Sequence, residues 1–244
     1  MDFIKYGQKI EVAVGSESSP RVLRWTTWEG GRNDLRVSYL LLTDDGGVLI
    51  DPVKVPLEGL DYLREFVDGF AAVVLTCANH DRDARWFGNQ VKAPVLVPQG
   101  SPAKAHKSAK RTFGDEELLG GLRAMSCGHD GGEMWVFWRL GRKRLLFCGD
   151  TIYGQTEPDG LAGYKPKWWM QADGIRLYRS GTLSRAEMRD RYSGLLAMNP
   201  TEVFNGHNPR SISNAGEAIA DVLDKGKLEV VKGAGTYLWR RWTK

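Results

Sequence analysis

Five short segments of the sequence place residues that could bind a metal ion or move a proton just after an apolar run or a turn. Their side chains include the imidazoles, thiols and carboxylates that hold zinc or iron and that serve as general acids and bases. They are Asp51, the segment 77–82, His129, Asp150 and His207. Strands that end at one edge of a sheet bring together the residues that follow them, so we expect one shared site.

Hydrophobic spacing predicts the elements that must position these residues. Apolar runs at 37–43 and 48–50, separated by Asp-Asp-Gly-Gly, predict an antiparallel hairpin. The other expected elements are helices over 57–67, 83–91, 182–198 and 215–223, and strands over 71–75, 95–97, 134–140, 144–148 and 203–204. Ser184 and Glu187 match a capping box at the start of the third helix. Residues 151–181, rich in Gly, Pro, Trp and Tyr, are expected to form an irregular rim over a pocket.

The order of the chemical segments resembles the motif series of the metallo-β-lactamase superfamily. The pieces are Leu-Ile-Asp-Pro at 49–52, Thr-Cys-Ala-Asn-His-Asp-Arg at 76–82, Gly-His-Asp-Gly-Gly at 128–132, Leu-Phe-Cys-Gly-Asp-Thr at 146–151 and Asn-Gly-His-Asn-Pro at 205–209. The likeness runs from about Val22 to Leu223. It implies an α+β fold, a four-layer αβ/βα sandwich of the metallo-β-lactamase type, and we expect a single domain over residues 1–244.

The first metal-binding motif of that superfamily is altered in this chain. The usual Thr-His-x-His-x-Asp-His gives two histidines to one metal, and an aspartate and a histidine to the other. Cys77, Asn79, Asp81 and Arg82 stand at those four positions, so only Asp81 matches. Cys77 is a competent ligand as a thiolate, but a cysteine at a strand end is more often a small buried hydrophobe. His80 falls on a spacer position, and a strand continuing that far would point it away from its neighbours.

The remaining ligands of the family map onto residues that are present. The resemblance assigns His129 to the first metal, His207 to the second and Asp150 as the carboxylate between them. It also implies that Asp51 supports the site through hydrogen bonds. A shifted ligand set that uses His80 and Asp83 is an alternative.

These changes lead us to expect one zinc or iron ion at most. The candidate ligands are His129, Asp150, His207, Asp81 and Cys77. Arg82 is a permanent cation that would repel a neighbouring ion, which argues against two full metals. With one ion, the resemblance implies a metal-dependent hydrolase acting on a small ester, thioester or lactone-like substrate, with Asp81 or Asp150 orienting a water.

Arg82 also supports a second account. It would pair with Asp150 or Asp81 and replace the lost ion, so the carboxylates stay neutralised without metal. Asn79, whose amide oxygen is a poor metal ligand, and Cys77, which stands where the family has a histidine, motivate this account. The protein would then be a catalytically inactive ligand-binding or regulatory member of the fold. Trp168, Trp169 and Tyr178 either line the pocket or anchor the rim to the core.

Composition narrows the class of partner. The chain has 244 residues and a net charge of +4, with lysines and arginines spread along it, so a small-molecule partner is expected and no nucleic acid. The start has no signal-peptide pattern, and no apolar stretch is long enough to span a bilayer. Three scattered cysteines fit a reducing compartment, so we expect a cytoplasmic protein without membrane attachment. Substrate identity and oligomeric state stay open.

Overall fold

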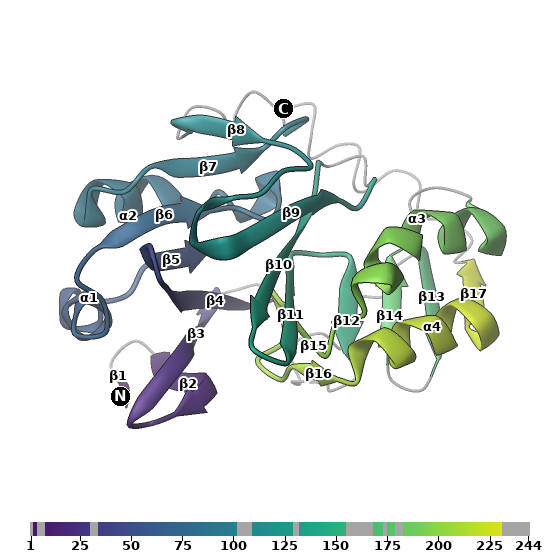
Figure 1. The fold of residues 1–244 in the computed structure, drawn as a ribbon, viewed down its shortest axis with the longest axis horizontal. Helices are drawn as coiled ribbons and strands as arrows, with labels where there is room; N and C mark the ends of the chain where they lie inside the picture. Colours follow the sequence, from purple (N-terminus) through teal and green to yellow (C-terminus); the bar gives the residue numbers. More distant parts are fainter. Residues whose placement is uncertain are drawn as a thin grey trace.

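A computed structural model gives the arrangement of most of the chain. It describes residues 2–3, 8–29, 34–101, 109–128, 132–154, 168–172, 175–178 and 183–230. The predicted site residue His129 lies outside this part. The described residues form three sheets flanked by helices (Figure 1).

The first sheet has eight strands, each beside the next in the sequence. They are β1 (Asp2–Phe3), β2 (Gln8–Ser16), β3 (Ser19–Glu29), β4 (Asp34–Thr43), β5 (Gly46–Ile50), β6 (Phe70–Val74), β7 (Val95–Pro98) and β8 (Arg111–Phe113). Pairing is antiparallel from β2 to β5 and parallel from β5 to β8. Helices α1 (Leu57–Arg64) and α2 (Ala84–Val91) provide two of the crossovers that parallel neighbours need.

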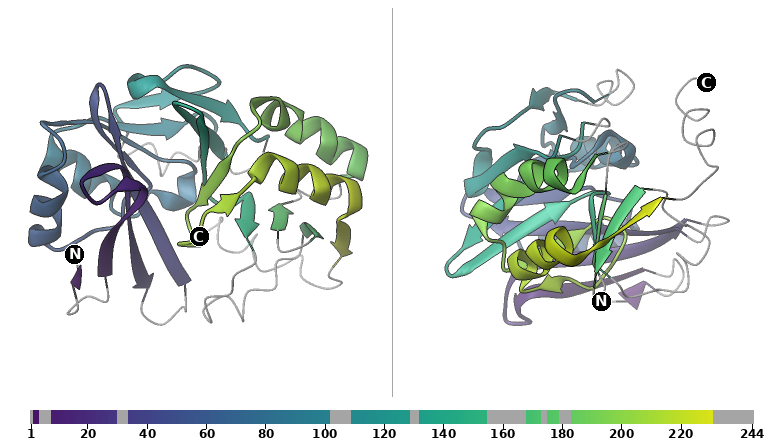
Figure 2. Two further views of the ribbon diagram at one scale, coloured as in Figure 1. Left: turned by 60° about the horizontal axis from the view of Figure 1, so that its bottom comes forward. Right: turned by 90° about the vertical axis from the view of Figure 1, so that its right-hand side faces the viewer.

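The second half of the chain forms two smaller sheets. One has the strand order β16-β15-β11-β10-β9, and the other has the order β12-β14-β13-β17. Their strands are β9 (Leu122–Ser126), β10 (Met134–Leu140), β11 (Lys143–Cys148), β12 (Ile152–Gly154), β13 (Trp168–Ala172), β14 (Ile175–Tyr178), β15 (Glu202–Asn205), β16 (Ile212–Ser213) and β17 (Lys227–Val230). Helices α3 (Arg185–Met198) and α4 (Ala215–Lys225) pack beside them (Figure 2).

The fold has four layers: helices α1 and α2, the eight-stranded sheet, the two smaller sheets, and helices α3 and α4. Three buried hydrophobic clusters lie between these layers. The central cluster joins the facing sides of the eight- and five-stranded sheets, with Tyr39 and Phe147 in edge contact at 5.3 Å between ring centroids. A second cluster lies between the eight-stranded sheet and α1 and α2, and a third between the smaller sheets and α3 and α4. Successive residues of a strand point to opposite faces, so Val73 joins the outer cluster while Val74 joins the central one. The expected αβ/βα sandwich is therefore confirmed.

Most of the expected elements are present. The hairpin between β4 and β5 turns through Asp44 and Asp45 only, a tighter turn than the four residues expected. The predicted capping box is formed, since Ser184 Oγ accepts from Glu187 N at 3.3 Å and Glu187 Oε2 accepts from Ser184 N at 2.6 Å.

Two regions differ from expectation. Residues 8–29 form the long strands β2 and β3, for which no prediction was made. The rim expected to be irregular contains β12, β13 and β14, which join β17 in the four-stranded sheet. Trp168, Trp169 and Tyr178 lie on β13 and β14, but their side chains are outside the described part, so their role stays a prediction.

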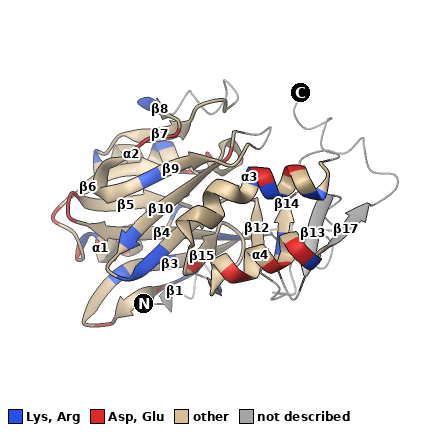
Figure 3. Cartoon of the chain, turned by 45° about the vertical axis from the view of Figure 1, so that its right-hand side comes forward, with Lys and Arg blue, Asp and Glu red and all other residues tan. Residues whose placement is uncertain are grey.

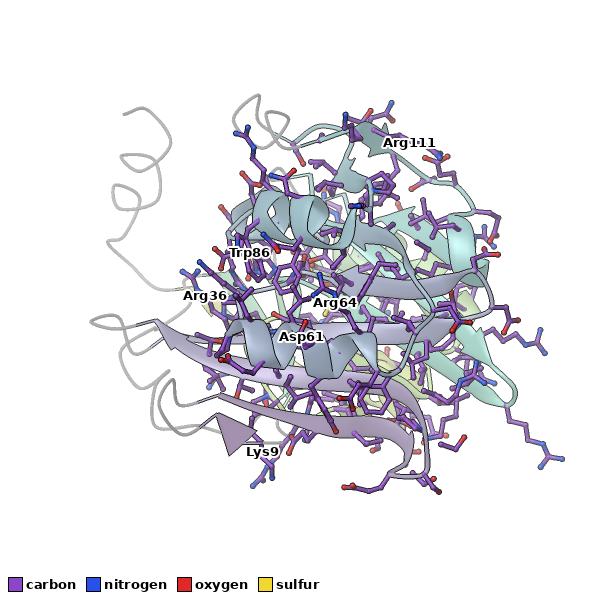
Figure 4. All side chains as sticks on the ribbon, turned by 90° about the vertical axis from the view of Figure 1, so that its left-hand side faces the viewer. Lys9, Arg36, Asp61, Arg64, Trp86 and Arg111 are labelled. Atoms are coloured by element: carbon purple, nitrogen blue, oxygen red, sulfur yellow. The ribbon has the colours of Figure 1, made fainter. Side chains whose placement is uncertain are left out.

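The outer helices carry charged side chains on their solvent faces. Arg64 and Asp61 form an ion pair of 2.7 Å on α1 (Figure 4). Acidic residues gather on α4, where Glu217, Asp221 and Asp224 occur (Figure 3). In the part of the chain that the structure describes, no helix is long and apolar enough to cross a membrane.

Candidate metal centre

His80 lies at the centre of the candidate site. After β6 the chain does not continue as a strand, because Ala78–His80 forms the short 3-10 helix η2. The expectation that His80 points outward depended on a continued strand, and the 3-10 turn instead carries its side chain inward. The His80 side chain is 1% exposed. A residue at a spacer position of the motif is thus the most deeply buried histidine of the described chain.

Asp51 fixes the turn that carries His80. Its Oδ1 accepts a hydrogen bond from Thr76 N at 2.7 Å, and its Oδ2 accepts one from Thr76 Oγ1 at 2.5 Å. The same Oδ2 lies 2.7 Å from His80 Nδ1. Asp51 itself has a φ of 47°, a left-handed conformation that aspartate tolerates better than most residues. These contacts support the role that the resemblance implies for Asp51.

Two further predicted residues meet His80. His207 Nε2 lies 2.9 Å from Asp150 Oδ1 and 3.3 Å from His80 Nε2. His80 Nε2 lies 3.5 Å from the same Asp150 oxygen. Three candidate ligand atoms, from the ends of β6, β11 and β15, therefore lie within 3.5 Å of one another.

The residue that contacts Nδ1 of each imidazole determines whether that nitrogen carries a hydrogen. His80 Nδ1 faces the Asp51 carboxylate, and His207 Nδ1 faces the carbonyl oxygen of Leu35 at 3.0 Å. Both neighbours are acceptors, so each Nδ1 carries a hydrogen, and each Nε2 is left to face the Asp150 carboxylate, to which it donates when the imidazole is protonated. The two Nε2 atoms lie 3.3 Å apart beside this carboxylate oxygen, an arrangement that a shared proton or a metal cation stabilises.

Glu133 holds the turn that carries Asp150. Its buried carboxylate accepts hydrogen bonds from Gly149 N at 3.1 Å, Asp150 N at 2.9 Å and Thr151 N at 3.2 Å. Thr151 Oγ1 donates a fourth bond at 2.6 Å, and accepts in turn from Trp135 Nε1 at 2.8 Å. Glu133 was not singled out from the sequence, where it is one acidic residue before an apolar strand.

Two glycines make room for the His80 ring. A Cβ on Gly206 would lie 2.3 Å from His80 Cε1, closer than atoms can approach. A Cβ on Gly149 would lie 2.8 Å from Thr76 Oγ1 and 3.2 Å from His80 Cε1. The glycines that precede Asp150 and His207 are therefore needed because His80 packs against both turns.

Cys77 belongs to a second possible ligand group. One ligand atom each from Cys77, His80 and Asp150 lie within 4.8 Å of one another. Cys77 Sγ is 3.9 Å from Asp150 Oδ2. Burial, followed by the charges of Asp150 and Glu133, raises the pKa of the Cys77 thiol well above its usual value. Without a metal ion this thiol stays protonated.

Charge around the site shifts the protonation of its members. Burial and the Arg82 charge lower the pKa of His80, but the Asp51 and Asp150 carboxylates outweigh them and the net shift is upward. Burial acts to raise the pKa of Asp150, and His80 and His207 hold it well below its usual value. For Glu133, burial and the Asp150 charge raise the pKa to about 7 against its hydrogen bonds. The centre therefore favours an ionised Asp150 between two imidazoles.

Arg82 is close to the centre without pairing with Asp150. In the described part of the chain, the ion pairs of Asp150 are with His80 and His207. Nε and Nη1 of Arg82 are buried and have no hydrogen-bond partner among the described residues. The sequence-based account has Arg82 pair with Asp150 or Asp81. Direct pairing with Asp150 is not what the described part of the structure has, and pairing with Asp81 stays a prediction.

The other predicted residues lie at the edge of the centre. Asn79 is exposed, and Asp81 ends the 3-10 turn, where its N–H donates to the Ala78 carbonyl. Asp81 is not in the ligand group that the described residues form around His80. Asp83, the partner of His80 in the shifted set, accepts from Lys54 N at 2.9 Å. His80 thus enters the site while Asp83 holds the loop before α1.

Tyr153 is a further member that the sequence did not indicate. Its hydroxyl donates to Asp150 Oδ1 at 3.2 Å, and its ring stacks on His207 at 5.9 Å between centroids. The stacking limits rotation of the His207 ring. The hydroxyl also places a neutral hydrogen-bond donor beside the carboxylate.

Comparison with known proteins agrees with this geometry at the level of the fold. No family model matches the chain, and no curated protein matches it. Among solved structures, the chain is similar to DIM-1 metallo-β-lactamase exposed to ceftazidime, at 14% identity and a TM-score of 0.61, covering 89% of this chain and 96% of that one.

Two other solved structures contain metal. The metallo-β-lactamase FIM-1 from Pseudomonas aeruginosa, in a mono-zinc form, is 15% identical with a TM-score of 0.58, covering 88% of this chain and 95% of that one. TTHA1623, in a di-iron-bound form, is 20% identical with a TM-score of 0.53, covering 79% of this chain and 96% of that one. At these identities the likeness shows the fold alone. The four layers of this chain are those of the metallo-β-lactamase fold.

Proposed function

We propose that the chain binds one zinc or iron ion through His80, His207 and Asp150 and uses it to hydrolyse a small ester, thioester or lactone-like substrate. The observation that carries the proposal is the convergence of two imidazole Nε2 atoms and a carboxylate oxygen. Anchoring of the two Nδ1 atoms by Asp51 and by the Leu35 carbonyl adds support, because metal-bound histidines are commonly oriented in this way.

The spacing of the three atoms fits a metal ion. Ligand atoms about 2.0–2.2 Å from a tetrahedral zinc lie about 3.3 Å from one another. The observed separations are 2.9, 3.3 and 3.5 Å. Two imidazoles and one carboxylate also suit iron. A site with three protein ligands leaves a position open for water or substrate, as hydrolysis requires.

His207 is a better third ligand than Cys77. His207 Nε2 already lies close to both Asp150 Oδ1 and His80 Nε2, whereas the buried Cys77 thiol would have to lose a proton that its surroundings retain. We therefore place Cys77 beside the open position, as a neutral thiol close to Asp150. His129 stays a candidate ligand from the sequence.

A bound ion would supply a Lewis acid and would lower the pKa of a coordinated water. Asp150 Oδ2 lies on the Cys77 side, away from the oxygen that faces the histidines, and can accept a proton from an attacking water. The Tyr153 hydroxyl is a neutral donor that can stabilise negative charge developing on a carbonyl oxygen. Asp81, the other catalytic candidate from the sequence, stays a prediction.

A second candidate function is ligand binding without catalysis. It is favoured by the charge of Arg82 beside Asp51 and Asp150, which opposes a second cation in the same space. In this account a proton between His80 and His207 takes the place of the metal ion. Metal content distinguishes the two candidates.

The test of the hydrolase proposal uses protein treated with a chelator and then reloaded with zinc or ferrous iron. A panel of 4-nitrophenyl esters, thioesters and lactones is assayed with wild type, Asp150→Asn and Asp83→Asn. We expect turnover that requires metal, falls at least about 100-fold in Asp150→Asn and is unchanged in Asp83→Asn. Turnover that survives both chelation and Asp150→Asn would refute it.

A further inference from the structure

We propose that Arg82 binds an anionic group of the substrate, so that the site takes substrates carrying a carboxylate or a phosphate close to the bond that is cleaved. This inference rests on the proposed metal site and names the substrate class for it. It starts from the unusual state of the Arg82 guanidinium.

Arg82 has hydrogen-bonding capacity that the described chain does not use. Its Nε and Nη1 are buried and have no hydrogen-bond partner among the described residues. A buried donor without an acceptor is costly, and the cost is higher for a charged group. The residue as a whole is only half-buried, so part of it is accessible to a ligand. A planar guanidinium can bind a carboxylate or phosphate through two parallel hydrogen bonds.

The charge of Arg82 becomes uncompensated when a metal ion binds. In the metal-free protein, Asp51 and Asp150 stabilise the charged form of Arg82 against burial. A divalent ion would balance those two carboxylates by itself. Arg36, labelled in Figure 4, adds a further positive charge that acts on Arg82. The Arg82 charge and its unused donors would then favour an anion as their partner.

The position of Arg82 makes the ligand part of the reaction site. Arg82 follows directly after the 3-10 turn that carries His80 and ends at Asp81, and its charge acts on the His80 ring, so an anion bound by its guanidinium would be near the ion held by His80. Asp150 is close enough to both to influence their pKa values. An anchored anion would orient the neighbouring carbonyl toward the open metal position, as substrate-positioning arginines do.

The experiment measures binding of propionate and of its neutral isostere propionamide. Both are titrated into zinc-loaded and chelator-treated protein, and affinity is taken from thermal stabilisation and from ligand NMR line widths. The variants are Arg82→Gln and Arg82→Lys. Arg85→Gln on α2 is the matched control, because it removes the same charge from an exposed residue nearby. Zinc content is measured on every sample.

We expect zinc-loaded wild type and Arg85→Gln to bind propionate at least about tenfold more tightly than Arg82→Gln does, with Arg82→Lys between them. Propionamide should bind weakly to all of them. Equal affinity of wild type and Arg82→Gln for propionate, or equal binding of the amide, would overturn the inference. If wild type holds no zinc, the hydrolase proposal fails separately, and the chelator-treated samples still decide whether Arg82 binds the anion.

Discussion

The turns after β6 and after β11 reach the same site, and a buried carboxylate holds each of them in a different way. Asp51 contacts the His80 ring directly as well as the Thr76 backbone and hydroxyl. Glu133 contacts the backbone of Gly149, Asp150 and Thr151 and leaves the Asp150 side chain alone. The first carboxylate therefore sets the chemistry of a ligand, and the second sets only its position.

This difference fits the altered first motif. The backbone-held turn after β11 keeps the aspartate that the family pattern leads one to expect. In the turn after β6, the residue that reaches the site is His80, whose ring contacts the Asp51 carboxylate. The comparison predicts that losing Glu133 affects folding most, whereas altering Asp51 affects metal binding most.

The largest effect should come from Glu133→Ala. It leaves four buried donors without their acceptor and should lower the free energy of unfolding by roughly 4 kcal/mol. Urea unfolding of the metal-free protein measures it, with Glu17→Ala in an exposed turn as control. A change below about 1 kcal/mol would mean that the turn after β11 does not depend on this carboxylate.

Asp51→Asn should weaken metal binding by about 10- to 100-fold at a smaller cost in stability. Asparagine is nearly the same shape, but its amide would donate to His80 Nδ1 and shift the ring hydrogen to Nε2, which faces His207. Zinc affinity measured against a chromophoric chelator checks this, with Asp83→Asn as the matched control. Unchanged affinity in Asp51→Asn would contradict the role of Asp51 as the group that sets the His80 tautomer.

Gly206→Ala tests the packing that lets His80 reach the second turn. The new Cβ would lie 2.3 Å from His80 Cε1, so the ring must move away from His207. We expect a loss of about 1–3 kcal/mol in stability and about tenfold in zinc affinity. Gly69→Ala is the control, because no atom lies within 4 Å of its added Cβ. If both variants bind zinc like wild type, the close packing is not needed for the site.

The smallest predicted effect is a pH dependence that Glu133 adds to stability. Its folded pKa of about 7 lies above its ordinary value of 4.5, so the folded protein binds more protons than the unfolded chain between these values. Its contribution is fully present below pH 4.5 and is lost as pH rises through about 7.

The urea-derived stability of metal-free wild type should therefore fall from pH 5 to pH 8 by on the order of 1 kcal/mol more than that of Glu133→Gln. His80 acts in the same direction in both proteins, since its pKa is also raised, and so it cancels in the comparison. An equal fall in both would place the titration elsewhere.

Continuous apolar runs of strand length made much of the fold predictable. In β10 and β11, apolar residues occupy both faces, and both strands were expected almost at their observed bounds. Strands β2 and β3 were missed because polar and charged residues such as Lys9, Glu11 and Arg24 interrupt their apolar pattern. Short strands in the rim were missed because Gly, Pro and aromatic residues obscure the alternation there.

The site was less predictable than the fold, because which residues reach it depends on the path of the chain through the 3-10 turn at Ala78–His80. Asp150 and His207 were expected from their motif contexts, and the structure brings them together. His80 was placed on a spacer, since period-two alternation does not anticipate a 3-10 turn. The signal that could have pointed to it was the pair of glycines Gly149 and Gly206, whose missing side chains leave room for a ring.

The central claim is that His80 and His207 share one metal ion with Asp150. Elemental analysis of protein purified without an affinity metal column tests it most directly, on wild type, His80→Gln, His207→Gln and Cys77→Ala. We predict one zinc or iron per chain in wild type and in Cys77→Ala, and none in either histidine variant. Full metal content in His80→Gln, or wild type that holds no metal and gains no stability from added zinc, would contradict the account.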